Sequence, residues 1–181
     1  MPNAGYEDAL AHLRPGITLC NATGVHDAST AELAVGLAIA SRRGFPEFMQ
    51  DQKNGIWNHR RFPALSDSNV GIVGFGSIGK EIAKKLSVFD VTVTAFTQSG
   101  RDGSLTVDQL DAHLPNLDIV ILILPLTDSS RHMFDAARLS KMKSGSLLIN
   151  MARGPVVVTD ALVAELNAGR LFAALDVTDP E

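Results

Sequence analysis

The sequence of 181 residues has one cysteine, Cys20, and therefore cannot form a disulfide within the chain. This excludes the small secreted scaffolds that disulfides hold together. Its apolar runs, such as residues 119–126, are far shorter than the ~20 residues that a membrane-spanning helix needs. Residues 1–5 have neither the positive charge nor the apolar segment of a signal peptide. We therefore predict a cytoplasmic protein with no membrane partner.

An excess of positive charge is also missing, since 16 Lys and Arg residues stand against 20 Asp and Glu residues, a formal net charge of −4. Nucleic acids and anionic membranes attract basic surfaces, so we expect neither as a partner. The remaining composition, 45% hydrophobic and 20% charged, is typical of a globular protein. The length favours one good core over two complete domains.

Short apolar segments alternate with segments whose apolar residues recur at helical spacing. We predict strands at 69–74, 91–97, 118–124, 146–150 and 173–177, and helices at 29–42, 78–86, 108–114, 136–143 and 159–167. Ser29 or Thr30 is expected to cap the first helix and Thr159 the last, which should end near Gly169. Residues 44–65 are expected to form a helix end and an irregular excursion. The alternation indicates an α/β fold with a doubly wound parallel sheet.

A glycine-rich motif lies between the first predicted strand and the helix after it: Gly74-Phe75-Gly76-Ser77-Ile78-Gly79. In a G-x-G-x-x-G loop the glycines permit a tight turn, close approach of a pyrophosphate and close helix–strand packing, while the helix N-terminus attracts negative charge. The strand–turn–helix setting favours a Rossmann-type dinucleotide site over the alternative, a tight turn without a ligand.

The end of the second strand bears on the choice of cofactor. An acidic residue there would hold the ribose hydroxyl of NAD, but this sequence has Thr97. A small hydroxyl with Arg101 nearby would instead accommodate the 2′-phosphate of NADP. Asp102 argues against this, and Arg101 also fits a solvated loop charge. The sequence therefore predicts NADP or NAD, with NADP slightly favoured, and no metal.

Several further segments, in the same order along the chain, resemble the D-isomer-specific 2-hydroxyacid dehydrogenases, including the phosphoglycerate dehydrogenase-like and glyoxylate–hydroxypyruvate reductase-like enzymes. Asn150–Gly154 resembles their N-x-A-R-G signature, and Asp176–Glu181 resembles their D-V-x-x-x-E segment. Residues 124–127, 30–32 and 3–5 resemble the P-L-T loop, the start of the long helix and the small-residue substrate loop. The resemblance implies hydride transfer between NAD(P) and a small 2-hydroxy or 2-keto acid.

The resemblance also implies roles for individual residues. Arg153 would grip the substrate carboxylate and the adjacent oxygen through two hydrogen bonds, a geometry that a guanidinium favours. The backbone of Ala4 and Gly5 would hold the same carboxylate, and Glu181 would orient the catalytic histidine. The remaining cofactor contacts would come from Leu124, Pro125, Met151, Ala152 and Asp176. Without the resemblance, Arg153 reads as a surface arginine, Glu181 as a frayed terminus and Asp176 as a turn cap.

Two features depart from that family. Its acid/base histidine follows a proline downstream of the glutamate, and none of the five histidines here follows a proline. Only residues 1–20 would belong to the substrate domain, whereas 21–181 would form the NAD(P)-binding domain. We therefore expect this chain to bind cofactor but to be weakly active or inactive, because losing general acid/base help costs roughly 10²–10⁴-fold in rate.

The segment 29–65 resembles the family's dimerisation arm. Trp57, with Phe48, Met49 and Phe62, would anchor a homodimer, although the same residues would also suit packing on their own domain. A different class of function stays open, because relatives of this fold include NAD(H)-responsive corepressors that act as interaction modules. The sequence does not indicate which 2-keto acid is used.

Overall fold

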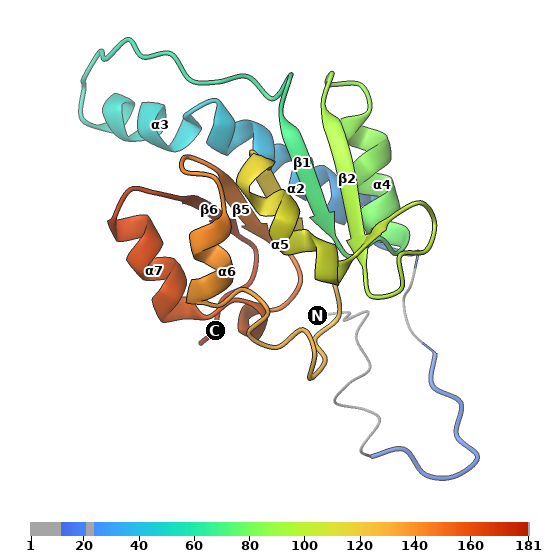
Figure 1. Cartoon of the computed structure of the whole chain (residues 1–181). Coiled ribbons are helices and arrows are strands. Elements are labelled where there is room, and N and C mark those ends of the chain that lie inside the picture. The colour runs from blue at the N-terminus through green and yellow to red at the C-terminus, as the bar shows by residue number, and fades with distance from the viewer. Residues whose placement is uncertain (1–11, 21–23, 181) are drawn as a thin grey trace.

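The computed structural model of this protein describes residues 12–20 and 24–180, and their centre is a six-stranded sheet (Figure 1). Every strand pair is parallel and the strand order is β3-β2-β1-β4-β5-β6. The strands are β1 (Asn69–Val73), β2 (Thr92–Thr97), β3 (Leu105–Thr106), β4 (Ile119–Leu122), β5 (Leu147–Asn150) and β6 (Phe172–Leu175). The chain thus winds outward from β1 in one direction and from β4 in the other. This confirms the predicted doubly wound parallel sheet.

Helices cover both faces of the sheet (Figure 1). The helices α2 (Asp27–Arg42) and α4 (Ser77–Leu86) pack on one face. The other face carries α5 (Leu110–His113), α6 (Ala136–Lys141) and α7 (Thr159–Asn167). Short 3₁₀ turns lie at Val107–Gln109, Leu114–Asn116 and Gly154–Val156. Because right-handed crossovers return each strand parallel to the last, all strands end at the same edge of the sheet.

Two apolar clusters fill the space between the sheet and its helices. In β4, Ile119 and Ile121 face the cluster beneath α2 and α4, whereas Val120 and Leu122 face the cluster beneath α5, α6 and α7. All four side chains are fully buried. Burial on both faces explains why this strand is apolar without alternation. Each such side chain contributes roughly 1.5–3 kcal/mol relative to exposure.

Residues 44–65 differ from the sequence prediction. A separate helix, α3 (Phe45–Lys53), follows α2, and only residues 54–64 are irregular. Gly44 ends α2 in the left-handed region (φ +65°), where an added Cβ would lie 2.3 Å from the Phe62 ring. Pro46 lies in the first turn of α3, where its missing N–H costs nothing. Gly44 and Pro46 therefore lie at the junction of two helices, and the predicted single helix end was wrong.

The predicted helix caps were also wrong. Helix α2 begins at Asp27 after His26, and the Ser29 hydroxyl donates to the His26 carbonyl oxygen. Helix α7 begins after Val158, while the Thr159 hydroxyl donates to the Asp179 carbonyl oxygen at 2.6 Å. Gly169 follows α7 at φ +64°, as expected for a residue beyond a helix end. The two-residue strand β3 was not predicted.

Candidate cofactor-binding site

The residues predicted to bind cofactor come from five segments that lie far apart in the sequence. Each follows or ends a strand of the parallel sheet: Gly74 follows β1, Thr97 ends β2, Leu124 lies two residues after β4, Met151 follows β5 and Asp176 follows β6. The parallel pairing brings these carboxyl ends to one edge. The chain reverses direction between β1 and β4, which is where open α/β sheets bind ligands.

Two glycines of the loop are required by the protein's own packing. Gly74 has φ +105°, and a Cβ there would lie 2.1 Å from the carbonyl oxygen of Ile123. A Cβ on Gly79 would lie 2.3 Å from the carbonyl oxygen of Gly74. Neither backbone atom can move aside cheaply, so Gly74 lets β1 turn beside the end of β4, and Gly79 lets α4 approach that turn.

The third glycine, Gly76, has no such requirement. An added Cβ would meet no atom within 4 Å, and its φ of −76° is open to any residue. Gly76 is the N-cap of α4, no side chain caps that helix, and its first turn has no acidic residue. The first N–H groups of α4 thus face an open surface with a positive helix-end field. This arrangement fits a pyrophosphate, whose approach a side chain at Gly76 would obstruct.

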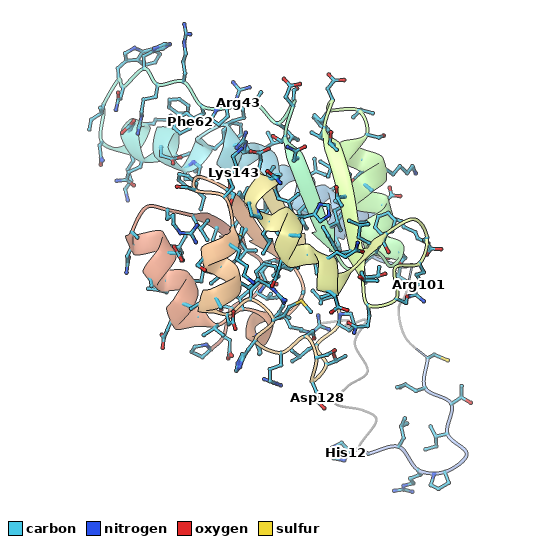
Figure 2. All side chains as sticks on the ribbon, in the orientation of Figure 1. His12, Arg43, Phe62, Arg101, Asp128 and Lys143 are labelled. Atoms are coloured by element: carbon cyan, nitrogen blue, oxygen red, sulfur yellow. The ribbon has the colours of Figure 1, made fainter. Side chains whose placement is uncertain are left out.

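The loop after β2 is held by its own hydroxyls. The Thr97 Oγ1 accepts a hydrogen bond from the Gly100 N–H at 3.0 Å and lies 2.8 Å from the Ser104 Oγ. The Ser104 hydroxyl also donates to the carbonyl oxygen of Arg101 at 2.6 Å. Figure 2 shows Arg101 and Asp128 at the end of the sheet opposite Phe62. The Thr97 hydroxyl is thus engaged within the loop, whereas the Arg101 side chain is exposed.

An ion pair joins this loop to α4. The Lys80 Nζ, in the first turn of α4, lies 2.8 Å from the Asp102 Oδ2. The hydrogen bond from Lys80 and its positive charge hold the pKa of Asp102 below its ordinary value. The sequence reasoning named Asp102 but missed Lys80. The position directly after the third glycine is the signal that would have found it, since that residue lies in the first turn of the helix.

The loop after β5 is organised by Asn150, whose exposed fraction is 1%. Its Nδ2 donates to the carbonyl oxygen of Arg153 at 3.0 Å, and its Oδ1 accepts from the Ala152 N–H at 3.0 Å. The Arg153 Nη1 donates to the Ala152 carbonyl oxygen at 2.7 Å. A Cβ on Gly154 would lie 2.0 Å from the Thr178 carbonyl oxygen. Arg153 is half-buried, and the loop that carries it is in close contact with the loop after β6.

The other predicted contacts differ in exposure. Met151 and Ala152 are buried and their side chains belong to the apolar clusters. Asp176 is exposed, and its N–H donates to the Asn150 carbonyl oxygen at 3.0 Å. Leu124 is half-buried and Pro125 is exposed, and the Pro125 carbonyl oxygen accepts from the Ser130 hydroxyl at 2.8 Å. Ala4, Gly5 and Glu181 lie outside the described residues.

The histidines within the described chain do not gather at this edge. His113 packs edge-on against Phe96, with ring centroids 5.5 Å apart. His132 is exposed, and only its backbone N–H reaches the Arg153 loop, donating to the Pro155 carbonyl oxygen at 2.8 Å.

Among residues 12–20 and 24–180, no group of three or more His, Cys, Asp or Glu side chains is arranged to hold a metal ion. None of the helices in those ranges has the length and apolar character to span a membrane.

The sheet order and the glycine loop define a dinucleotide-binding domain. The profile of the family described as "D-isomer specific 2-hydroxyacid dehydrogenase, NAD binding domain" matches residues 35–181. The chain therefore belongs to the D-isomer-specific 2-hydroxyacid dehydrogenases, as the sequence motifs predicted. A hydroxypyruvate reductase from Thermotoga maritima is 34% identical over 171 residues, which cover 92% of this chain and 56% of that protein. The chain spans about half the length of the curated relatives it matches.

Two similar solved structures hold different cofactors. An NAD-dependent formate dehydrogenase from Staphylococcus aureus, in complex with NAD, is 33% identical with a TM-score of 0.81, covering 89% of this chain and 51% of its own. A D-isomer-specific 2-hydroxyacid dehydrogenase from Xanthobacter autotrophicus Py2, in complex with NADPH and MES, is 29% identical with a TM-score of 0.86, covering 99% and 60%. Family membership thus leaves the choice between NAD and NADP to individual residues.

Proposed function

We propose that this chain is the cofactor-binding part of an oxidoreductase that transfers hydride between NAD(P) and a small 2-hydroxy or 2-keto acid. The observation that carries the proposal is the open space at Gly76, in front of the uncapped N-terminus of α4 and at the point where the strand order reverses. No packing requirement accounts for this glycine, whereas the approach of a pyrophosphate does. In this proposal residues 1–20 belong to a substrate domain and residues 21–181 form the cofactor domain.

The loop Gly74–Gly79 would hold the pyrophosphate through backbone N–H groups, and the bound nicotinamide supplies or accepts the hydride. Leu124, Pro125, Asp176 and the backbone near Met151 and Ala152 would line the rest of the cofactor, since all follow strands at that edge. These assignments follow the family's motifs residue by residue.

Arg153 would bind the acid. Its guanidinium offers two parallel N–H donors to the substrate carboxylate and the neighbouring oxygen, and a positive charge beside an oxygen whose negative charge grows during reduction. Asn150 would act as a positioning residue, because both of its side-chain hydrogen bonds fix the turn that carries Arg153. Ala4 and Gly5 would contribute backbone donors, and Glu181 would support a histidine. Fixed geometry of this kind contributes several kcal/mol to lowering a barrier.

We favour NADP over NAD for this chain. Thr97 leaves the end of β2 without a carboxylate that would repel a 2′-phosphate, and exposed Arg101 lies four residues further on. Asp102 weighs on the other side, although it is paired with Lys80. The substrate within the class of small 2-keto acids stays open.

We also propose a cytoplasmic homodimer. Helix α3 and residues 54–64 lie at the amino-terminal ends of the strands, away from the cofactor edge (Figure 1). Within this part of the dimerisation arm (residues 29–65), Phe48 and Phe62 pack on each other, with ring centroids 5.3 Å apart. Trp57 is 93% exposed and Met49 69%. An exposed indole of this size would anchor a second copy by burying its apolar surface.

A titration of the purified chain with NADPH and NADH, followed by assays with glyoxylate, hydroxypyruvate and pyruvate, tests this function. We expect binding of both cofactors, tighter for NADPH, and slow turnover, because none of the five histidines matches the family's proline–histidine pair. Fast turnover would show that one of those five histidines serves as acid/base. A chain that binds neither cofactor would contradict the proposal.

A further inference from the structure

The ion pair between Lys80 and Asp102 lies between two elements that the proposed function assigns to one cofactor. Lys80 belongs to the first turn of α4, whose N-terminus would hold the pyrophosphate, and Asp102 belongs to the loop after β2, where the adenosine ribose would lie. Both side chains are about half exposed, at 52% and 48%. A ligand at this edge therefore meets them as surface charges.

Asp102 lies in a tight turn with a left-handed backbone. Its φ is +57°, and those of Gly100 and Gly103 are +66° and +76°. Few non-glycine residues adopt this left-handed conformation, in which aspartate and asparagine are the best tolerated. Two bonds from Ser104 to the Arg101 carbonyl oxygen, from its N–H at 3.0 Å and its hydroxyl at 2.6 Å, close the turn. The loop thus holds this carboxylate beside Lys80.

The charges of Lys80, Arg101 and Asp102 do not cancel. Lys80 and Arg101 are positive and Asp102 is negative, so these three side chains together carry a net charge of one positive unit. A 2′-phosphate carries about −1.5 to −2 charges and accepts several charge-assisted hydrogen bonds. An ammonium has three donors, and Asp102 occupies one of those on Lys80. The carboxylate therefore both masks a cation and repels the phosphate.

We propose that Asp102 is a specificity-determining residue, which restrains the preference for a 2′-phosphorylated dinucleotide by holding Lys80 in an ion pair. This inference rests on the proposed cofactor function. Without the carboxylate, Lys80 is free to join Arg101 at the phosphate, and NADPH gains relative to NADH. Both cofactors share the pyrophosphate, so the ratio of the two dissociation constants isolates the effect at the ribose.

The test measures the dissociation constants of NADPH and NADH for the 181-residue chain by calorimetry. Asp102→Asn is expected to shift the ratio about tenfold toward NADPH, the effect of one favourable charge-assisted contact. Asn accepts the left-handed backbone, so the loop should persist. Asp67→Asn is the matched control: Asp67 has φ +63° but lies at the amino-terminal side of β1. Its substitution should leave the ratio within about twofold, because the length of β1, roughly 16 Å for its residues Asn69–Val73, separates Asp67 from the cofactor edge and exceeds a Debye length of about 10 Å.

A second substitution separates masking from direct repulsion. In a Lys80→Met background, Asp102→Asn is expected to shift the ratio only about twofold, because no cation remains to be released. An undiminished tenfold shift would overturn the role of Lys80. Weaker NADH binding by Asp102→Asn, with NADPH unchanged, would instead make Asp102 a ribose ligand. An unchanged ratio overturns this inference alone, whereas a chain that binds neither cofactor overturns the proposed function as well.

Discussion

The buried side-chain amide of Asn150 donates to the carbonyl oxygen of Arg153 at 3.0 Å and, through its oxygen, accepts from the N–H between them, that of Ala152. One side chain thus pairs with a donor and an acceptor of the turn after β5. The Arg153 carbonyl oxygen also accepts from the Val156 N–H at 3.2 Å, whereas the buried Ala152 N–H relies on the amide oxygen.

Removal of this amide should destabilise the chain. Asn150→Ala removes the partner of the Ala152 N–H in a buried turn, and it removes one of the two hydrogen bonds to the Arg153 carbonyl oxygen. The loss should cost about 2 kcal/mol of unfolding free energy. Urea denaturation measures the loss, with Asn167→Ala as the control, since Asn167 is exposed at the last turn of α7. Equal stability of the two variants would show that water replaces the amide.

Two glycines of the loop Gly74–Gly79 should respond to substitution in opposite ways. Gly79→Ala places a Cβ against the Gly74 carbonyl oxygen and should cost about 2 kcal/mol or more of folding stability. Gly76→Asp places a carboxylate in open space at a helix N-cap, which should leave stability unchanged or raise it by about 0.5 kcal/mol. The same carboxylate should abolish cofactor binding through repulsion.

Calorimetric titration with NADPH and urea denaturation of both glycine variants check this pair of predictions. Gly76→Ser is the neutral control for the cap, because it keeps the helix start without adding a charge. A Gly76→Asp variant that still binds NADPH with wild-type affinity would remove the pyrophosphate from this loop.

Asp118 should make stability depend on pH in acid. Burial raises the pKa of this carboxyl, but hydrogen bonds from Lys143 at 2.7 Å and from the Asn69 N–H at 2.8 Å outweigh it and hold the pKa below its ordinary value. A depressed pKa stabilises the folded state above the unfolded value of about 3.9, and this contribution is lost as pH falls through the lower folded value.

Asp118→Asn tests this by urea denaturation at neutral pH and over the range below pH about 4. At neutral pH the variant should be about 1–2 kcal/mol less stable than the wild type, and the difference should shrink as the carboxylate is protonated. Asp128→Asn, at an exposed turn, is the control. A pH-independent difference would assign the loss to packing.

The arm should matter for assembly and not for folding. Trp57→Ser removes an indole that is 93% exposed, so the unfolding free energy of a monomer should change by less than about 0.5 kcal/mol. If Trp57 anchors a second copy, sedimentation velocity should show a dimer that dissociates in this variant. Val88→Ser, 77% exposed after α4, is the control. A monomeric wild type would contradict the proposed homodimer.

Much of the fold could be predicted because burial on both faces leaves a simple trace in the sequence. The unbroken apolar run of β4 and the glycine loop beside β1 are enough to place the centre of the sheet. Helix α3 could not be predicted in the same way. Gly44 and Pro46 favour both an irregular loop and a junction between two helices, and only the packing of Phe62 on Gly44 distinguishes them.

The candidate site shows the same division. Arg153 and the glycine loop follow from motifs and their position after strands. The pairing of Lys80 with Asp102 does not, because 22 positions separate them and their contact depends on a left-handed backbone at Asp102. The hydrogen bond between the hydroxyls of Thr97 and Ser104 could not be predicted from residue types either.

The three glycines of the loop Gly74–Gly79 would be lost at different rates in the course of evolution. Gly74 and Gly79 are tied to the chain's own backbone, so any descendant that keeps the fold must keep them. Gly76 is not constrained by contacts within the protein, so only a bound cofactor would require it. A lineage that abandoned dinucleotides would be free to replace Gly76 first, with its two neighbours still in place. The residue at this single position in a relative is therefore a record of whether its ancestors went on using the cofactor.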